Sequence, residues 1–384
     1  MTIDLSALAA VDTHCHLFLP QLEDKSFDRY WTLSTLPLDP ADIRSTVLFQ
    51  TMKSRLARFL GLPETAPFEE IAAERTRRYR ADPTSYVGAL FADAGIGTLL
   101  IDIGYPSEED EGIDIDPGEF RRMLAGQDIR IIVRIEPVMY SLLKRELSFG
   151  EFVDEYRADL LRQLDEHSAV ALKTTIAYYT GLEVRPVSVG RAERAYGAVA
   201  GAPEGEADRE ALKDYRDFFL LEALEIAMER GLPMQVHTGM GDSPEIDLRL
   251  ADPSHLRWLI ADHHFGRATI VLVHGGYPHH AAAGFLVSAY PNVWLDVSEM
   301  VPFVGSGVTS RLLELFEMAP LSKIMYGSDG FNIPEVFWFA AVQFRRGLAA
   351  ALEQLVSAGH VSSGFALEAA EGILNKNARR LYRL

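Results

Sequence analysis

The stretch Val11-Asp12-Thr13-His14-Cys15-His16-Leu17 decides the fold of this chain. An apolar run leads into the aspartate, and two histidines follow it two positions apart. Alternate side chains of an extended strand point to the same face, so His14 and His16 can reach one point in space. Neutral imidazole is a common ligand of zinc and similar ions. Read alone, the motif is explained equally well by two polar residues at the end of a strand.

Further potential ligands lie far downstream, each at the carboxyl end of a strand-like segment. They are Lys173, His237, His274 and Asp329. His237 and His274 each end an apolar run and precede Thr-Gly or Gly-Gly, where the backbone can turn sharply. Six such residues on five strand ends are hard to attribute to chance, and together they predict a metal site.

Eight short apolar runs alternate with helical patterns along the chain. They are Leu8–Leu17, Thr98–Ile103, Ile129–Pro137, Ala169–Ile176, Pro233–Thr238, Thr269–His274, Val293–Val297 and Lys323–Gly327. Strands that alternate with helices imply a parallel sheet, and eight such units predict an α/β fold of the (β/α)8 TIM-barrel type. We expect one barrel domain over residues 1–384. The helices expected outside the first insertion are Ser85–Ala94, Arg209–Arg230, Pro334–Ala350 and Ala366–Arg379.

Three helical insertions are expected after strands 1, 4 and 5. They comprise residues 20–84, with helices over Pro40–Leu60 and Pro67–Arg80, and residues 177–206 and 239–254. Because each follows a strand, it should lie at the face where barrel enzymes build their sites. We predict that 20–84 caps the barrel mouth, with solvent-exposed decoration as the alternative.

Composition narrows the class of protein. The 384 residues are 48% hydrophobic and 24% charged, which is ordinary for a globular protein with a large core. The net charge of −18 disfavours nucleic acid and acidic membranes as partners. The single cysteine, Cys15, excludes a disulfide within the chain and should face away from the two histidines. No signal peptide or apolar run of about 20 residues is seen, so a cytoplasmic location is expected by default.

Asp329 and Lys173 carry the predicted chemistry. A carboxylate at the eighth strand end could bind metal, accept a proton from water whose pKa the metal lowers, and pass it to a leaving group. Helix capping is the alternative role of Asp329. A lysine inside an apolar strand is costly unless it is paired or modified. Lys173 is therefore either a carbamate that bridges two metals or an unmodified lysine that binds substrate or forms an ion pair.

Four residues are candidates for substrate binding. Arg134 and Glu136 alternate on the third expected strand and should point into the barrel mouth, where Arg134 could clamp a carboxylate. A mutual ion pair between Arg134 and Glu136 explains them as well. Tyr178 follows the fourth strand and could line the pocket. Asp242 either binds substrate or holds the loop after the fifth strand.

Taken together, five segments resemble the amidohydrolase superfamily, amidohydrolase-2 type, over nearly the whole chain. They are Asp12–His16, Leu172–Leu182, Gln235–Asp242, His274–Pro278 and Tyr326–Gly330. The resemblance is nearest to the branch that includes the N-terminal domain of FluG-type and nodulin/glutamine-synthetase-like proteins. It implies a barrel with one or two divalent metals and ligands at His14, His16, His237 and Asp329. With two metals, Lys173 and His274 would be further ligands; with one, His274 would polarise the scissile bond.

The resemblance implies a hydrolase that cleaves an amide, or a lactone or ester, of a small-molecule substrate. Arg134 makes an acidic substrate such as a γ-glutamyl amide conceivable. A decarboxylase or a uronate-type isomerase is the alternative, and a non-catalytic metal-binding barrel is a third, against which the full ligand set argues. Zinc is the expected metal, although histidine and carboxylate also suit Mn, Fe or Co. A homo-oligomer is left open.

Overall fold

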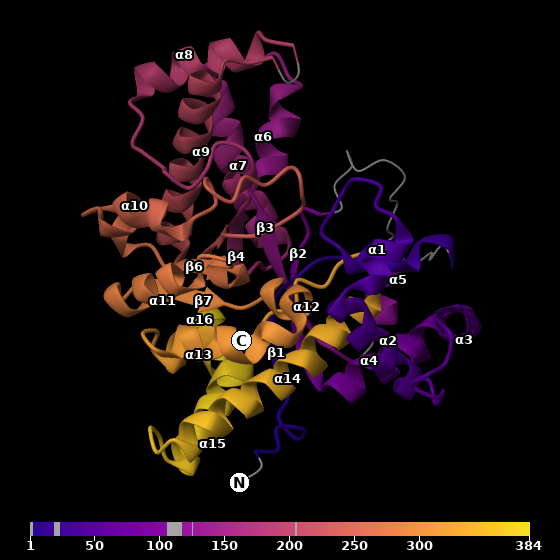
Figure 1. Cartoon of the computed structure of the whole chain (residues 1–384). Coiled ribbons are helices and arrows are strands. Elements are labelled where there is room, and N and C mark those ends of the chain that lie inside the picture. Colours follow the sequence, from indigo (N-terminus) through magenta and orange to yellow (C-terminus); the bar gives the residue numbers. More distant parts are fainter. Residues whose placement is uncertain (1–2, 19–23, 106–116, 125, 204–205) are drawn as a thin grey trace.

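Eight parallel strands form one sheet in chain order, which confirms the predicted (β/α)8 barrel. The computed structural model describes residues 3–18, 24–105, 117–124, 126–203 and 206–384 (Figure 1). The strands are β1 (Ala10–Cys15), β2 (Ile96–Asp102), β3 (Asp128–Arg134), β4 (Ala171–Thr174), β5 (Met234–His237), β6 (Ile270–Val273), β7 (Val293–Asp296) and β8 (Ile324–Met325).

The first and last strands meet through backbone hydrogen bonds that close the barrel. The Thr13 amide donates to the Tyr326 carbonyl at 3.1 Å, and the Asp329 amide donates to the His14 carbonyl at 2.8 Å. The second bond lies just beyond β8. It places the strand ends that carry His14 and Asp329 side by side, although 315 positions separate them in the sequence.

The barrel interior is filled by apolar side chains from every second strand position, as expected where a parallel sheet is covered on both faces. These side chains include Val11, Leu100, Ile132, Ala171, Val271 and Met325. Tyr382, near the end of the chain, packs against the same cluster. Lys173 and Gln235 interrupt this apolar filling, so the interior becomes polar toward the carboxyl ends of the strands.

Helices surround the barrel. Outside the first insertion they are α4 (Pro83–Ala94), α5 (Pro117–Met123), α6 (Glu136–Leu143), α7 (Phe149–Glu166), α8 (Val189–Ala200), α9 (Arg209–Arg230), α10 (Arg257–Ala261), α11 (His280–Ala289), α12 (Met300–Val304), α13 (Val308–Phe316), α14 (Pro334–Ser357), α15 (Ser363–Glu371) and α16 (Asn377–Tyr382). The prediction for α9 is confirmed to the residue. Asp208 caps its first turn and Gly231, with φ +63°, ends it.

Several predicted boundaries were wrong. The expected strand Ile129–Pro137 ends at Arg134, and Glu136 begins α6, because a proline suits the first turn of a helix. The expected helix Ala366–Arg379 is divided by a π-helical turn at Gly372–Lys376. The expected helix Pro334–Ala350 continues to Ser357.

The expected helix Pro40–Leu60 is two helices, α1 (Pro40–Ser45) and α2 (Val47–Phe59). Thr46 between them has an extended backbone, and its side chain accepts from the Phe49 amide. Threonine is a favoured helix-capping residue, and its hydroxyl satisfies an amide that the helix itself leaves unbonded. The second helix therefore has its own start, which the apolar periodicity does not reveal.

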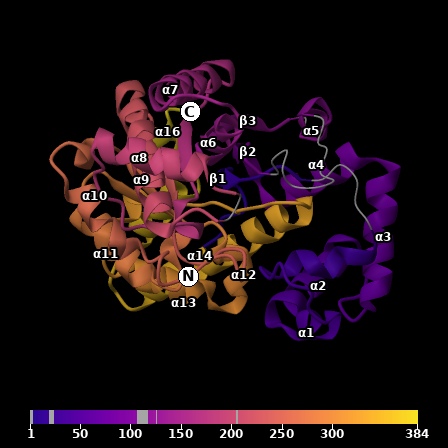
Figure 2. The ribbon, with the colours of Figure 1, turned by 90° about the horizontal axis from the view of Figure 1, so that it is seen from above.

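The first insertion packs on one flank of the barrel. Figures 1 and 2 show α1, α2 and α3 (Phe68–Ala81) together beside α4 and α14. A buried ion pair anchors it there: Arg75 Nη2 of α3 lies 3.0 Å from Glu335 Oε2 of α14. Tyr86 of α4 donates to the same carboxylate at 2.9 Å. Residues 20–23 lie outside the described residues.

The first insertion also reaches the loop that follows β5. The Thr35 amide donates to the Ser243 carbonyl at 2.9 Å, and the Ser243 amide donates to the Leu33 carbonyl at 2.8 Å. Two segments that both follow strands are thereby joined. The role of residues 20–84 as a cap over the barrel mouth stays a prediction.

The other two insertions differ in kind. Residues 177–206 contain α8, which packs on α9 and projects with it from the barrel; 204–205 lie outside the described residues (Figure 1). The helical prediction for 239–254 was wrong, because these residues form turns and extended chain until the short 3-10 helix Pro253–Leu256. None of the helices in the described part of the chain combines the length and apolarity that a membrane-spanning segment needs.

Candidate metal centre

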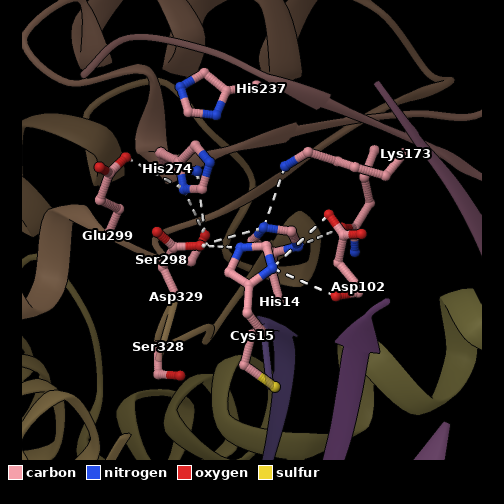
Figure 3. A network of polar contacts seen from close by, with 12 residues as sticks. His14, Cys15, Asp102, Lys173, His237, His274, Ser298, Glu299, Ser328 and Asp329 are labelled. Carbon is pink, nitrogen blue, oxygen red and sulfur yellow. Dashed lines mark hydrogen bonds and ion pairs between the residues drawn. The ribbon is translucent and has the colours of Figure 1, made fainter. Parts of the chain in front are cut away.

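Three predicted ligands meet at the carboxyl ends of β1 and β8. His14 Nε2 lies 3.2 Å from Asp329 Oδ1, and His16 Nε2 lies 3.3 Å from the same oxygen. All three residues are buried. The alternation of side chains along β1 thus turns both histidines to one side, while Cys15 between them packs toward the Leu100 carbonyl. Figure 3 shows His14 beside Asp329.

The hydrogen bonds of Gln235 decide which nitrogen of His14 faces Asp329. Gln235 Nε2 donates to the Thr13 carbonyl and to the Tyr382 hydroxyl, both at 2.8 Å. Its Oε1, which can only accept, lies 2.8 Å from His14 Nδ1. We infer that Nδ1 carries the proton and that Nε2 directs a lone pair at Asp329.

This arrangement fits a divalent cation. Asp329 Oδ1 is buried and has no hydrogen-bond partner among the described residues, although two imidazole nitrogens face it. An imidazole lone pair opposite a carboxylate oxygen is unfavourable unless a positive charge lies between them. Imidazole nitrogen and carboxylate oxygen are also a donor set that zinc and related ions accept.

The protonation states favour the same reading. Burial, followed by the charge of Lys173, lowers the pKa of His14 to about 4. Burial also lowers the pKa values of His237 and His274 well below the ordinary range. Burial alone would raise the pKa of Asp329, whereas positive charge on the imidazoles beside it, His274 first, lowers that pKa well below its usual range, so the carboxylate stays ionised where a positive charge is near. Neutral imidazole and ionised carboxylate are the forms that bind metal.

Lys173 of β4 points into the same space. Its side chain is buried, and its Nζ lies 3.2 Å from His14 Nε2. Burial lowers the pKa of Lys173 to about 8, against the opposing charge of Asp102. The amine therefore belongs to the centre, and its conversion to a carbamate stays a prediction.

His237 and His274 form a second pair, with ring centroids 4.3 Å apart. His237 Nε2 lies 2.8 Å from the Met240 carbonyl, an acceptor, so the free lone pair of His237 is on Nδ1. Gly241 allows this loop to approach closely, because a Cβ there would lie 2.9 Å from His237 Nε2. Among the described residues His237 shares no ligand group with His14, His16 or Asp329, so its assignment to one centre with them stays a prediction.

The potential ligands of the described residues fall into three groups whose ligand atoms lie within 4.8 Å of one another. These groups are His14–His16–Asp102, His14–His274–Asp329 and His237–His274–Glu299. Asp102 and Glu299 were not predicted as site residues. Asp102 is the next-to-last residue of the second apolar run, and Glu299 follows the seventh run by two positions. A search for acids at or just after every strand end would have found both.

The predicted substrate-binding residues are placed differently from expectation. Arg134 Nε and Nη2 lie 3.0 and 2.7 Å from Asp102 Oδ2, so the mutual pair of Arg134 and Glu136 was wrong. Glu136 lies in α6 and accepts from the Thr174 hydroxyl at 2.6 Å. The Tyr178 ring packs 4.6 Å from the His237 ring, and its hydroxyl accepts from the amide of Asp242.

The comparison with known families matches this geometry. The model of the Amidohydro_2 family, described as amidohydrolase, matches residues 157–384. The chain belongs to the amidohydrolase family. The matched part carries Lys173, His237, His274 and Asp329, whereas His14 and His16 precede it and join the site through the closure of the barrel. Family and fold together indicate an enzyme.

Three known proteins are similar to this chain. Protein FluG of Emericella nidulans is 26% identical over 404 residues, which cover 97% of this chain and 45% of FluG. The chain thus spans about half the length of that relative. A putative metal-dependent hydrolase from Lactobacillus casei is 24% identical with a TM-score of 0.83, covering 100% of this chain and 98% of that one. Uronate isomerase from Thermotoga maritima is 16% identical with a TM-score of 0.70, covering 98% and 95%. At these identities the two structures show a shared fold.

Replacing Gln235 with leucine is expected to weaken the affinity for Zn²⁺ by about 10- to 100-fold, because His14 then loses the acceptor that holds its ring and tautomer. Competition with a chromophoric chelator measures the affinity. Gln343→Leu is the matched control, since Gln343 is a buried glutamine of α14 that bonds the Gly305 carbonyl. Equal affinities in the two variants would contradict the role of Gln235.

Proposed function

We propose that this protein is a metal-dependent hydrolase that cleaves an amide, or a lactone or ester, of a small substrate by attack of water. The observation that carries the proposal is the Asp329 carboxylate, which faces His14 and His16 within 3.3 Å in a buried site. His14, His16 and Asp329 would hold a divalent ion, with zinc the first candidate. When bound, such an ion lowers the pKa of water and polarises a carbonyl group.

Residues of the chain would transfer the proton and hold the reacting groups in position. Asp329 accepts the proton that water loses on attack and delivers it to the leaving nitrogen or oxygen, so that one carboxylate acts first as base and then as acid. Gln235 holds His14 in the tautomer that leaves Nε2 free. His274 is held by the Ser298 hydroxyl, whose Oγ lies 3.0 Å from its Nδ1, and would orient the scissile group.

For the substrate we propose a small molecule with an acidic group. Arg134 supports this proposal, and a substrate carboxylate would share or displace its contact with Asp102. Tyr178 and Asp242 are proposed to border the pocket on the side of β5, and Glu136 to support it from α6. The exposed Asp242 can change position more readily than the buried Glu136.

Isotope incorporation tests the reaction class. The metal-loaded enzyme is incubated with a panel of small amides and lactones in water enriched in ¹⁸O, and the products are analysed by mass spectrometry. Hydrolysis places one ¹⁸O in the new carboxylate. Turnover that releases CO2, or that shifts hydrogen without incorporating ¹⁸O, would instead indicate a decarboxylase or a uronate-type isomerase. The Asp329→Asn variant, treated alike, measures spontaneous exchange.

A further inference from the structure

The segment that carries Asp329 leaves β8 and lies against β1. The Asp329 amide donates to the His14 carbonyl at 2.8 Å, and the His16 amide donates to the Gly330 carbonyl at 2.7 Å. Both bonds join backbone groups, so they bring the segment to β1 whatever side chains it carries. The direction of the Asp329 carboxylate depends in addition on the backbone dihedral angles of Asp329 itself.

Asp329 has an unfavourable backbone conformation. Its φ is +51°, in the left-handed region that a residue with a side chain rarely adopts, although aspartate tolerates it better than most. Such conformations persist only where the surrounding structure holds them. Relaxation to a negative φ would redirect the carboxylate, which faces His14 and His16 at 3.2 and 3.3 Å. Contacts on both sides of Asp329 are therefore needed to keep its side chain in place.

Asp12 of β1 supplies contacts on both sides. Its Oδ1 accepts from the Ser328 amide at 2.8 Å, and its Oδ2 accepts from the Ser328 hydroxyl. Ser328 Oγ in turn accepts from the Gly330 amide at 2.8 Å, since a hydroxyl can donate one hydrogen bond and accept others. One carboxylate thus restrains the residues immediately before and after Asp329.

The side chains of Asp12 and Ser328 are removed from the centre itself. Both residues are 0% exposed, and Asp12 belongs to none of the ligand groups among the described residues. Figure 3 shows the Ser328 side chain directed away from His14 and His274. The contacts between Asp12 and Ser328 therefore act on the centre through the backbone of Asp329.

We propose that Asp12, acting through Ser328, is a positioning residue that fixes the direction of the Asp329 carboxylate. An aspartate suits this role because its two oxygens accept from the amide and the hydroxyl of Ser328 at once, whereas asparagine has a single acceptor oxygen. The inference rests on the proposed metal-dependent function and deepens it. It assigns the geometry of the general acid–base residue to a side chain that touches neither metal nor substrate.

Zinc affinity tests the inference without an assay of activity, by competition of the folded proteins with a chromophoric chelator. Ser328→Ala removes the hydroxyl that joins Asp12 to the Gly330 amide. Asp12→Asn leaves one acceptor oxygen for the two donors of Ser328. We expect each variant to bind Zn²⁺ at least about tenfold more weakly than the wild type, since loss of an outer partner of a metal ligand costs about 10- to 100-fold.

A double-mutant cycle separates positioning from a general loss of structure. In the Asp329→Asn background, Ser328→Ala should weaken zinc binding by less than about threefold, because the carboxylate on which Ser328 acts is no longer present. An equal loss of affinity in both backgrounds would show that Ser328 does not act through Asp329, and the inference would be overturned.

Asn377→Ala is the control for lost stability alone. The buried Asn377 side chain donates to the Leu321 and Ile324 carbonyls at 2.9 and 2.8 Å, where β8 begins. Its replacement should lower the melting temperature and leave the zinc affinity within about threefold of the wild-type value.

Crystal structures of the Asp12→Asn and Ser328→Ala proteins without metal give a second readout. We expect Asp329 to leave its left-handed conformation and its Oδ1 to lie farther from His14 Nε2 than the 3.2 Å of the wild type. An Asp329 that keeps its position in these variants, or zinc affinities equal to that of the wild type, would overturn the inference. Should Ser328→Ala fail to fold, Asp12→Asn, which keeps the shape of the side chain, decides the question.

The proposed function and this inference can fail separately. Weakened zinc binding and a displaced Asp329, with no ¹⁸O incorporation from any substrate turned over, would refute the hydrolase and leave the positioning role standing. Hydrolysis that Asp12→Asn and Ser328→Ala leave at the wild-type rate, with Asp329 unmoved, would do the reverse.

Discussion

Replacing Asp329 with asparagine is expected to lower kcat/KM by about 10²- to 10⁴-fold on any substrate that the wild type hydrolyses, which is the usual contribution of general acid–base catalysis. Asparagine keeps the shape of the side chain but cannot take up the proton of the attacking water or return it to the leaving group. It also removes the charge that faces His14 and His16 at 3.2 and 3.3 Å. Steady-state kinetics on metal-loaded protein measures the effect.

Circular dichroism and the metal content of the Asp329→Asn protein separate lost chemistry from lost structure. Asp247→Asn is the matched control, because Asp247 lies in the loop after β5 and pairs with Arg249 away from the centre. Activity of the Asp329 variant within tenfold of the wild type, with metal still bound, would exclude its role in proton transfer.

Removing the metal is expected to abolish activity and to lower the melting temperature. A ligand that binds only the native state stabilises it by RT ln(1 + [L]/Kd), about 4 kcal/mol when free metal exceeds Kd a thousandfold. Without a cation, the Asp329 carboxylate and the imidazole lone pairs face one another at short distance in a buried space. Dialysis against dipicolinate followed by differential scanning calorimetry measures the shift.

Readdition of Zn²⁺, Mn²⁺ or Co²⁺ should restore both the melting temperature and the activity, and the most effective ion identifies the preferred metal. The Asp329→Asn protein should lose less stability on chelation, because this variant lacks the carboxylate that would bind the ion together with His14 and His16. A wild-type melting temperature and activity that chelation leaves unchanged would show that no cation takes part.

Local patterns in the sequence determined the barrel and most of the candidate ligands. Apolar runs of strand length that alternate with helical periodicity are properties of neighbouring residues, and so is the polar residue that ends each run. The helix over Arg209–Arg230 could be predicted to the residue, because the residues that flank it, Asp208 and Gly231, favour the start and the end of a helix. His14, His16, Lys173, His237, His274 and Asp329 were found in the same way.

Only the tertiary structure decided how these residues are grouped and which partners hold them. Gln235 contacts His14 although 221 positions separate the two residues in the sequence. Arg134 pairs with Asp102 rather than with Glu136, which is nearer in sequence, because α6 begins where a longer strand was expected. Glu299 enters through a left-handed backbone conformation that no periodicity reveals. Strand register and loop conformation depend on the packing of the whole barrel. The candidate ligands can therefore be identified from local sequence, whereas their grouping in space follows from contacts between distant strands.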